Sequence, residues 1–387
     1  MRCPACFEDG YDSTTCPICG FIRTEVCESS FLEIGTLLHN GEYIVGRLLR
    51  EPEILGLTYL AWHVPKEKKV TLREYFPFQV VTRAADGINI SLHSGEYRRL
   101  FESSLPDMEQ QAEIVMRIEH PGIAQVTDYF RDHGTLYLVS GCFCRQTLSE
   151  YLSHTGKQSC SKTLELFQPI LDGLSAAHEM NLLHLDIQPG NICIKTDGQA
   201  VLSGFGFIRN FQEGRFKSWM PAVNPGFAAV EQYHRNGRRG PWTDVYSIAA
   251  IVYLMVTGQL PPDSVERITE DHIVPVNELA PELSGTIAAA IMQGLSVRPG
   301  DRPQSIQEFR QWLTSAQVVK CSNSQDEQFQ ETAMTRYLRL SVEAAEREAN
   351  DAAKKNLDLA KISKKTWMIV MAAIIMLVVA GWLFRGQ

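Results

Sequence analysis

The clearest run of hydrophobic positions in this chain lies near its C-terminal end. Residues 366–384 carry no charged side chain, and a helix of this length spans about 28 Å, the thickness of the hydrocarbon core of a bilayer. Trp367 and Trp382 lie close to the two ends of the run, where aromatic side chains favour the membrane interface. The pattern predicts one transmembrane helix, with a buried core helix as the alternative. Because several lysines precede the run and only Arg385 follows it, we expect the preceding residues to be cytoplasmic.

The segment before this run has the pattern of a long helix. Residues 325–365 are rich in Ala, Glu, Lys and Leu and contain no Pro or Gly, a composition that favours helix. Over residues 338–359 the apolar positions alternate in spacings of four and three, which is the heptad pattern of a coiled coil. Several of these positions hold only alanine. The segment therefore predicts either a solvated stalk helix or a parallel homodimer through 338–359.

Two pairs of cysteines stand near the N-terminus. Cys3 and Cys6 form one C-x-x-C pair, Cys16 and Cys19 form a second, and nine residues separate them. Each pair can direct two thiolates at one point, so two pairs complete a tetrahedral four-cysteine zinc site; a redox pair or unrelated cysteines are the alternative. A segment as short as residues 1–28 needs the metal in order to fold. Four protein ligands leave no open position, which predicts a structural zinc. The segment resembles bacterial zinc ribbons, and this implies a module that binds a protein partner.

Composition and charge narrow the class of protein further. The chain has 387 residues, of which 44% are hydrophobic and 21% are charged, as in globular proteins. Its net charge of -8 gives no electrostatic reason to expect a nucleic acid partner. The remaining cysteines are scattered, as in a chain of the reducing cytosol, and do not indicate a disulfide scaffold. We see no secretory signal before Cys3.

Two polar motifs flank a short apolar stretch in the middle of the chain. Residues 184–191 read HLDIQPGN, and residues 202–206 read LSGFG. They resemble the catalytic loop H-R-D-x-K-x-x-N and the D-F-G motif of protein kinases, and residues 35–316 resemble a bacterial serine/threonine protein kinase domain along their whole length. The resemblance implies an α+β, bilobal fold with a cleft for ATP and Mg²⁺. It also implies that Asp186 accepts the proton of a substrate hydroxyl and that Asn191 holds a metal ion.

The chain departs from this family where residues contact phosphate or metal. Gly204 stands at the position of the D-F-G aspartate, and Gln188 at that of the loop lysine. The glycine-rich loop keeps only its last glycine, Gly56. Arg73 replaces the lysine of the third strand, whose compact ammonium a planar guanidinium does not reproduce, and Gln111 replaces its glutamate partner. In the family these residues all stabilise the negative charge that develops on the phosphates during transfer. Their loss therefore implies an inactive or weak enzyme. ATP and Mg²⁺ binding stays open, with Gly56, Arg73 and Gln111 as candidate nucleotide contacts.

Positions that hold the fold of the family together are kept. Glu231 stands where the glutamate of the family's A-P-E motif does, and the resemblance pairs it with Arg302 in a buried ion pair. Asp244 lies at the start of the central helix of the large lobe. In this setting Asp186 and Asn191 fit a hydrogen-bonded framework better than a working catalytic pair.

The selective loss favours a membrane-tethered pseudokinase that regulates or scaffolds protein partners through its zinc ribbon and its cleft. The alternative is an atypical serine/threonine kinase that transfers phosphate from ATP to protein substrates. In a bacterium the chain would be a single-pass protein of the inner membrane, with its N-terminal bulk cytoplasmic. This interpretation divides the chain into a zinc ribbon (1–28), a kinase-like domain (35–316), a linker and helical stalk (317–365) and a transmembrane helix (366–384).

Overall fold

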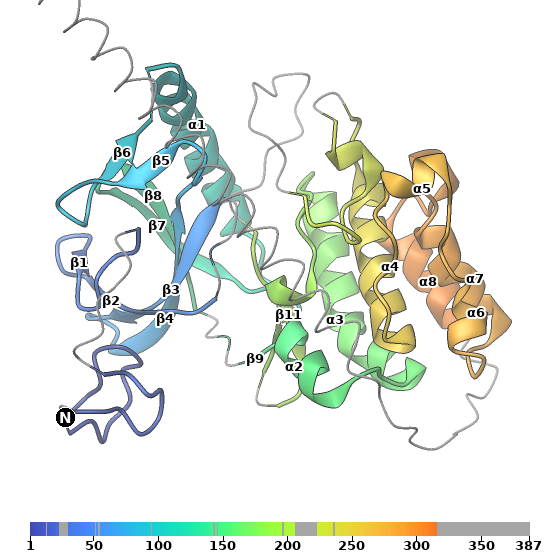
Figure 1. Ribbon diagram of the computed structural model, residues 1–387, viewed down its shortest axis with the longest axis horizontal. Coiled ribbons are helices and arrows are strands. Elements are labelled where there is room, and N and C mark those ends of the chain that lie inside the picture. The colour runs from blue at the N-terminus through green and yellow to red at the C-terminus, as the bar shows by residue number, and fades with distance from the viewer. Residues whose placement is uncertain are drawn as a thin grey trace, which may run out of the picture. The chain divides into compact units, whose positions relative to one another are not determined.

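A computed structural model describes residues 1–315 except 13, 23–29, 51, 53, 54, 94, 142, 143, 145, 196, 206–222, 235 and 236 (Figure 1). The chain separates into two compact units, residues 1–329 and 330–387, of which only the first contains described residues. The predicted stalk, its seam over 338–359 and the apolar run 366–384 lie outside the described part. Of the helices in the described part, none is long and apolar enough to cross a membrane.

The first lobe is built on a six-stranded antiparallel sheet in the order β1-β2-β3-β4-β8-β7. Its strands are β1 (Leu37–Leu38), β2 (Tyr43–Leu48), β3 (Gly56–His63), β4 (Lys68–Tyr75), β7 (Val126–Asp132) and β8 (Thr135–Ser140). Helix α1 (Gly95–Val115) packs against β7 and β8. Strand β3 is buried at nearly every position, which indicates that both faces of the sheet are covered there.

A small hairpin, β5 (Val81–Arg83) with β6 (Ile90–Leu92), is attached to this lobe by a buried ion pair. Both terminal nitrogens of Arg83 donate to the carboxylate of Glu74, over 2.8 and 2.7 Å, and the Tyr137 hydroxyl donates to it over 3.0 Å. Burial raises the pKa of Tyr137 well above its usual value, and the neighbouring Glu74 carboxylate adds to the rise. Because both charges are buried and hydrogen-bonded, the pair fixes the hairpin to β4.

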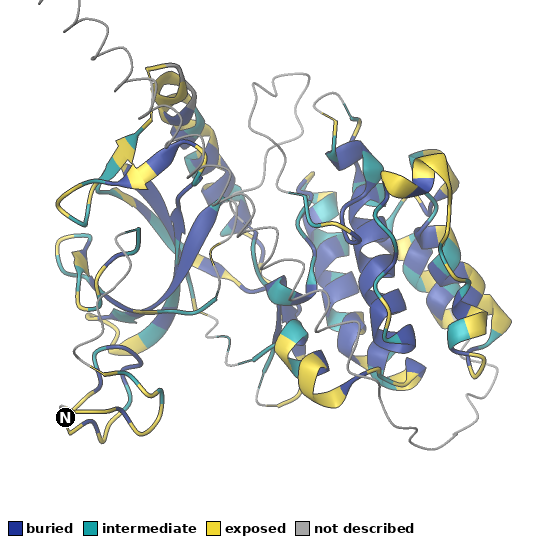
Figure 2. Cartoon of the chain, in the orientation of Figure 1, coloured by how far each residue is buried: buried dark blue, intermediate teal, exposed yellow. Residues whose placement is uncertain are grey.

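The second lobe is helical and packs around one buried helix (Figure 2). Its elements are β9 (Gln146–Thr147), α2 (Leu148–Thr155), α3 (Cys160–Glu179), β10 (Ile192–Ile194), β11 (Ala200–Leu202), α4 (Pro241–Thr257), α5 (Glu266–Thr269), α6 (Val276–Leu279), α7 (Gly285–Gly294) and α8 (Ile306–Ser315). Short 3₁₀ turns cover Pro189–Asn191, Val230–Gln232 and Pro299–Asp301. Helix α4 is buried from Thr243 to Thr257, as expected of a helix that is apolar on all sides. Pro241 begins it, and Gly258, in the left-handed conformation at φ +73°, ends it.

One ion pair joins the turn before α4 to the segment before α8. Arg302 donates to both carboxylate oxygens of Glu231, over 2.8 and 3.1 Å, and both side chains are buried. Arg302 also donates to the backbone carbonyls of Ser296 and Val297, over 2.7 Å each. The Thr243 hydroxyl adds a third hydrogen bond to Glu231. The guanidinium therefore links several separate segments of the second lobe at one point.

Candidate functional site

Asp244 of α4 holds the loop that carries Asp186 through hydrogen bonds to its backbone. The Asp244 carboxylate accepts hydrogen bonds of 2.8 Å from the His184 and Leu185 amides and pairs with the His178 ring over 2.8 Å. Burial pushes the pKa of Asp244 upward, but the hydrogen bonds and the His178 and His184 rings outweigh burial, so its pKa is lowered. Leu185 adopts φ +60°, which costs an ordinary residue about 1–2 kcal/mol. The two amide contacts to Asp244 hold this turn.

Asp186 is enclosed by side-chain amides. Gln188 and Asn224 donate to one carboxylate oxygen over 3.1 and 2.8 Å, and Asn191 donates to the other over 2.9 Å. A carboxylate with three amide donors is well satisfied as a structural acceptor. The same geometry leaves Asp186 at the position that the family resemblance assigns to a catalytic base.

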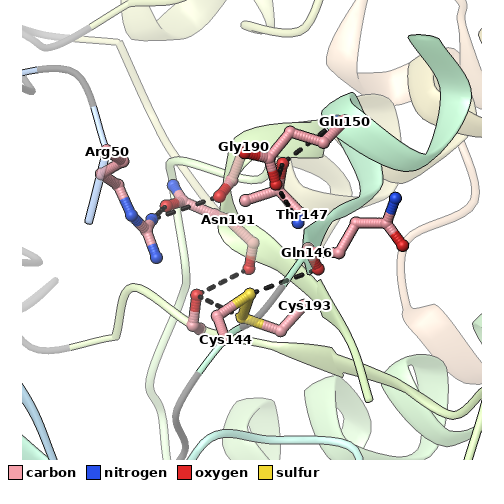
Figure 3. Close-up of a disulfide and its surroundings, with 9 residues drawn as sticks. Arg50, Cys144, Gln146, Thr147, Glu150, Gly190, Asn191 and Cys193 are labelled. Carbon is pink, nitrogen blue, oxygen red and sulfur yellow. Dashed lines mark hydrogen bonds between the residues drawn. A yellow bond between two sulfur atoms is a disulfide. The ribbon is translucent and has the colours of Figure 1, made fainter. Parts of the chain in front are cut away.

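Arg50, which no motif in the sequence indicates as a site residue, reaches this loop from the segment between β2 and β3. Its terminal nitrogen donates to Asn191 Oδ1 over 2.8 Å and to the Gly190 carbonyl over 3.2 Å, and Figure 3 shows the guanidinium directed at both. Asn191 is buried, and its amide nitrogen already donates to Asp186. A cation of the protein itself therefore contacts the oxygen that the resemblance assigns to a metal ion.

The neighbouring cationic contact comes from Arg73 on β4, which donates to the Gly204 carbonyl over 2.7 Å. Gly204 has φ +102°, and a Cβ there would lie 3.2–3.3 Å from the Asn191 side chain. An aspartate at this position would thus be strained and crowded. Gln111 lies buried on α1, and its side-chain oxygen meets no hydrogen-bond donor among the described residues. The described contacts of Arg73 and Gln111 thus do not reproduce a lysine–glutamate ion pair.

A cavity of about 40 Å³ lies between these groups, which is room for a few water molecules. Arg50 and Arg73 line it together with four hydroxyl side chains, several apolar side chains and two cysteines; the hydroxyls are those of Thr58, Thr71, Ser140 and Ser203. Gly56 and Gln111, predicted as nucleotide contacts, are absent from this lining, whereas Arg73 belongs to it. The cavity is small, and the charged side chains in its lining are both cationic.

The two cysteines of the cavity wall form a disulfide that the sequence does not predict. Cys144, in the segment after β8, is bonded to Cys193 of β10, with 5.3 Å between their Cα atoms (Figure 3). The two residues lie 49 positions apart in the chain. No local spacing pattern could have indicated this pair.

The four N-terminal cysteines lie together in space. Their sulfur atoms are within 4.8 Å of one another, with 3.8 Å between Cys3 and Cys19 and 3.7 Å between Cys6 and Cys16. A tetrahedron with Zn–S bonds of about 2.3 Å has sulfurs about 3.8 Å apart, so this set fits zinc. Each cysteine pair is closed by a turn: the Gly20 amide donates to the Cys16 carbonyl, and the Phe7 amide donates to the Cys3 carbonyl.

This cysteine module packs directly on the outer face of the sheet. Phe7 and the three buried cysteines share a core with Leu60 of β3, and the Phe7 and Trp62 rings lie 5.8 Å apart. Arg2 lies over the Trp62 ring, with its Cζ 4.2 Å from the ring centroid, and Lys69 of β4 pairs with Glu8 over 2.6 Å. The module therefore covers the face of β3 that carries Leu60 and Trp62.

Gly46 of β2 shows how close this contact is. A Cβ at this position would lie 2.7 Å from both the Ala5 carbonyl and the Phe7 ring, and 2.9 Å from the Leu60 carbonyl. The next residue, Arg47, donates its amide to the Ala5 carbonyl over 2.9 Å. The module thus contacts β2 at Gly46 and Arg47, a few residues before Arg50 in the chain.

Comparison with known proteins gives the family. The sequence-family model of the protein kinase domain matches residues 98–320, which is more than half of the chain. The chain belongs to the protein kinase family. It is 30% identical over 160 residues to the serine/threonine-protein kinase PknL of Mycobacterium tuberculosis, covering 41% of this chain and 40% of that protein. It is 27% identical over 286 residues to serine/threonine-protein kinase C of Synechocystis, covering 72% of this chain and 50% of the relative.

A solved structure described as "PpkA-294 apo form" has the same fold, with a TM-score of 0.61 and 27% sequence identity. The match covers 73% of this chain and 99% of that one. The bilobal kinase fold and the relation to bacterial serine/threonine kinases are therefore confirmed. The chain spans only 40% to 50% of the length of these two curated relatives.

Proposed function

We propose that this protein is a pseudokinase, a kinase-shaped regulatory or scaffolding module that does not use Mg–ATP efficiently. The observation that carries the proposal is the contact of Arg50 with Asn191 Oδ1. In protein kinases a metal ion bound by the loop Asn and the D-F-G Asp neutralises the charge that develops on the phosphates. Here Arg50 donates a hydrogen bond to Asn191, the first of these metal ligands, and Gly204 replaces the aspartate that would be the second.

Electrostatics support this proposal. Mg²⁺ is usually held by one or two carboxylates together with substrate phosphates, whereas Arg50 and Arg73 both line this cavity. A divalent ion about 4 Å from a guanidinium is repelled by about 8 kcal/mol at an effective dielectric constant of about 20. With Gly204 at the aspartate position, no carboxylate from there offsets that repulsion.

Phosphate transfer tests the proposal directly. The full chain, given ATP with Mg²⁺ or Mn²⁺ and a mixture of protein substrates, is expected to turn over at least about 10⁴-fold more slowly than the roughly 1–100 s⁻¹ of active kinases. Radiolabelled phosphate incorporation measures the rate, and Asp186→Asn is the matched control. A rate near the family range that is abolished in Asp186→Asn would overturn the proposal.

An atypical kinase is the second candidate function, and one observation favours it. Asp186 remains in the catalytic loop and is hydrogen-bonded to Asn191 over 2.9 Å, so a base could still receive a substrate proton. In that case Arg50 and Arg73 would contact phosphate oxygens in place of a metal. The Asp186→Asn comparison separates the two candidates.

The remaining parts of the proposal concern metal, membrane and partners. The cysteine module would hold one structural zinc, and residues 366–384 would anchor the chain with its N-terminal bulk in the cytoplasm. Protein partners would then meet the module or the cleft, and residues 338–359 would allow a homodimer. Recovery of the full chain in the soluble fraction after membranes are sedimented would contradict the anchor.

A further inference from the structure

We propose that Cys144 and Cys193 form a reversible thiol–disulfide site that controls the conformation of the cleft. The disulfide connects the segment between the lobes to β10, and β10 begins directly after Asn191. Both cysteines belong to the cavity wall that Arg50 and Arg73 also line. The bond therefore joins the connection between the lobes to a strand that begins next to Asn191, the residue that Arg50 contacts.

The other cysteines indicate that this bond is reversible. Five described cysteines lie outside this disulfide, and four of them form the cluster in the N-terminal module. That cluster holds metal only as thiolates, so, if it binds zinc as proposed above, the protein works where thiols stay reduced. In such a compartment a disulfide is usually transient and serves catalysis or redox sensing. Among the described residues this is the one disulfide, and it lies in the wall of the cleft cavity, which fits the sensing class.

The chemistry needs an external disulfide of low molecular weight, such as glutathione disulfide. Cys144 is partly exposed and Cys193 is buried, so the Cys144 thiolate attacks first, breaks the external S–S bond and releases one thiol. The Cys193 thiolate then attacks the mixed disulfide at the Cys144 sulfur and releases the second thiol. In total two cysteine thiols are oxidised to one disulfide, and one external disulfide is reduced to two thiols.

The structural consequence follows from the neighbours of Cys193. The Ser203 hydroxyl donates to the Asn191 carbonyl over 2.9 Å, and the Cys193 sulfur lies 3.9 Å from that hydroxyl. Once the S–S bond is reduced, nothing holds the Cys144 and Cys193 sulfurs at bonding distance. Reduction therefore moves the cavity wall next to Asn191, and oxidation holds it in the arrangement of Figure 3.

Hydrogen exchange on the full chain tests this proposal. The protein is equilibrated with glutathione disulfide or with an excess of dithiothreitol, the thiols are mapped by alkylation, and amide exchange is followed by mass spectrometry. We expect a cross-linked Cys144–Cys193 peptide that dithiothreitol removes while the protein stays folded. We also expect exchange in residues 136–141 and 191–195 to be at least about tenfold slower in the oxidised form, because the cross-link restrains local opening.

Two variants make the result specific. Cys144→Ser, or Cys193→Ser if the first does not fold, is expected to exchange like the reduced protein in both conditions. Cys160→Ser changes a buried cysteine of α3 that is not part of this disulfide, and this variant is expected to respond like the unchanged protein. Failure to form the cross-link, a cross-link that dithiothreitol removes only from unfolded protein, or equal exchange in both forms would each overturn the proposal.

Discussion

Replacing Arg302 by methionine is expected to lower the free energy of unfolding by about 3–5 kcal/mol, because it leaves the buried Glu231 carboxylate without its cation. The guanidinium donates to that carboxylate over 2.8 and 3.1 Å and to two backbone carbonyls over 2.7 Å. Methionine fills part of the volume but can donate to none of these acceptors. Unsatisfied buried acceptors add their own cost to the loss of the ion pair.

Urea unfolding followed by circular dichroism measures this change. Arg298→Met is the matched control, because Arg298 is an exposed arginine on the same segment, and it is expected to change stability by less than about 0.5 kcal/mol. A loss below about 1 kcal/mol in Arg302→Met would contradict the structural role assigned to the pair. Glu231→Gln combined with Arg302→Met is expected to be less destabilising than the two single losses added together, since neither charge then remains buried alone.

Removal of zinc is the second change with a large expected effect. Structural zinc in small modules binds with an apparent free energy of about 10–16 kcal/mol, and this energy drives their folding. The cysteine module shares its core with Leu60 and packs on Trp62. Chelation is therefore expected to unfold residues 1–22, expose the outer face of β3 and lower the melting temperature of the first lobe.

Metal content and tryptophan fluorescence check this prediction. We expect about one zinc per chain, and a red shift of Trp62 emission when a strong chelator removes it. Cys16→Ser is expected to lose the metal, whereas Cys160→Ser, which changes a cysteine outside the cluster, is expected to keep it. Protein without zinc that retains its melting temperature and its emission spectrum would contradict a structural metal.

The sequence predicts local features better than distant ones. The spacing of Cys3, Cys6, Cys16 and Cys19 is short enough to fix a metal geometry by itself, and the four sulfurs do meet. The kinase-like fold could be predicted from motifs at 184–191 and 202–206, because the family's loop and strand pattern is distinctive. The packing of the cysteine module on β3 was not predicted, since the pattern of β3 shows only that it is buried and not what covers it.

The cleft could be predicted only in part. The sequence shows which residues of the family are lost, but it does not show which contacts take their place in the cleft. Arg50 and Asn191 are 141 positions apart, and the loop around Arg50 has no glycine pattern that fixes its path. The signal that could have indicated this contact is the presence of a cation, Arg50, in a chain that has lost the metal-binding aspartate at position 204. The conformation of Gly204 was equally hidden, because its φ of +102° depends on the surrounding chain.

Three features of the cleft agree with one another. Arg50 contacts the oxygen assigned to a metal, Gly204 has a backbone that disfavours an aspartate, and Asp186 accepts hydrogen bonds from three amides. Each feature supports a site organised around the protein's own hydrogen bonds. The proposed function and the proposed redox site both depend on how tightly this arrangement is held.

The most direct test of the central proposal is a thermal unfolding titration of the full chain with ATP, in the presence and absence of Mg²⁺. A ligand at 100 times its Kd stabilises a protein by about 2.7 kcal/mol, which for a domain of this size raises the melting temperature by roughly 5–10 °C. If Arg50 occupies the metal position, millimolar ATP should shift the melting temperature by less than about 1 °C more with Mg²⁺ than without it. A shift of several degrees that requires Mg²⁺ would contradict the account.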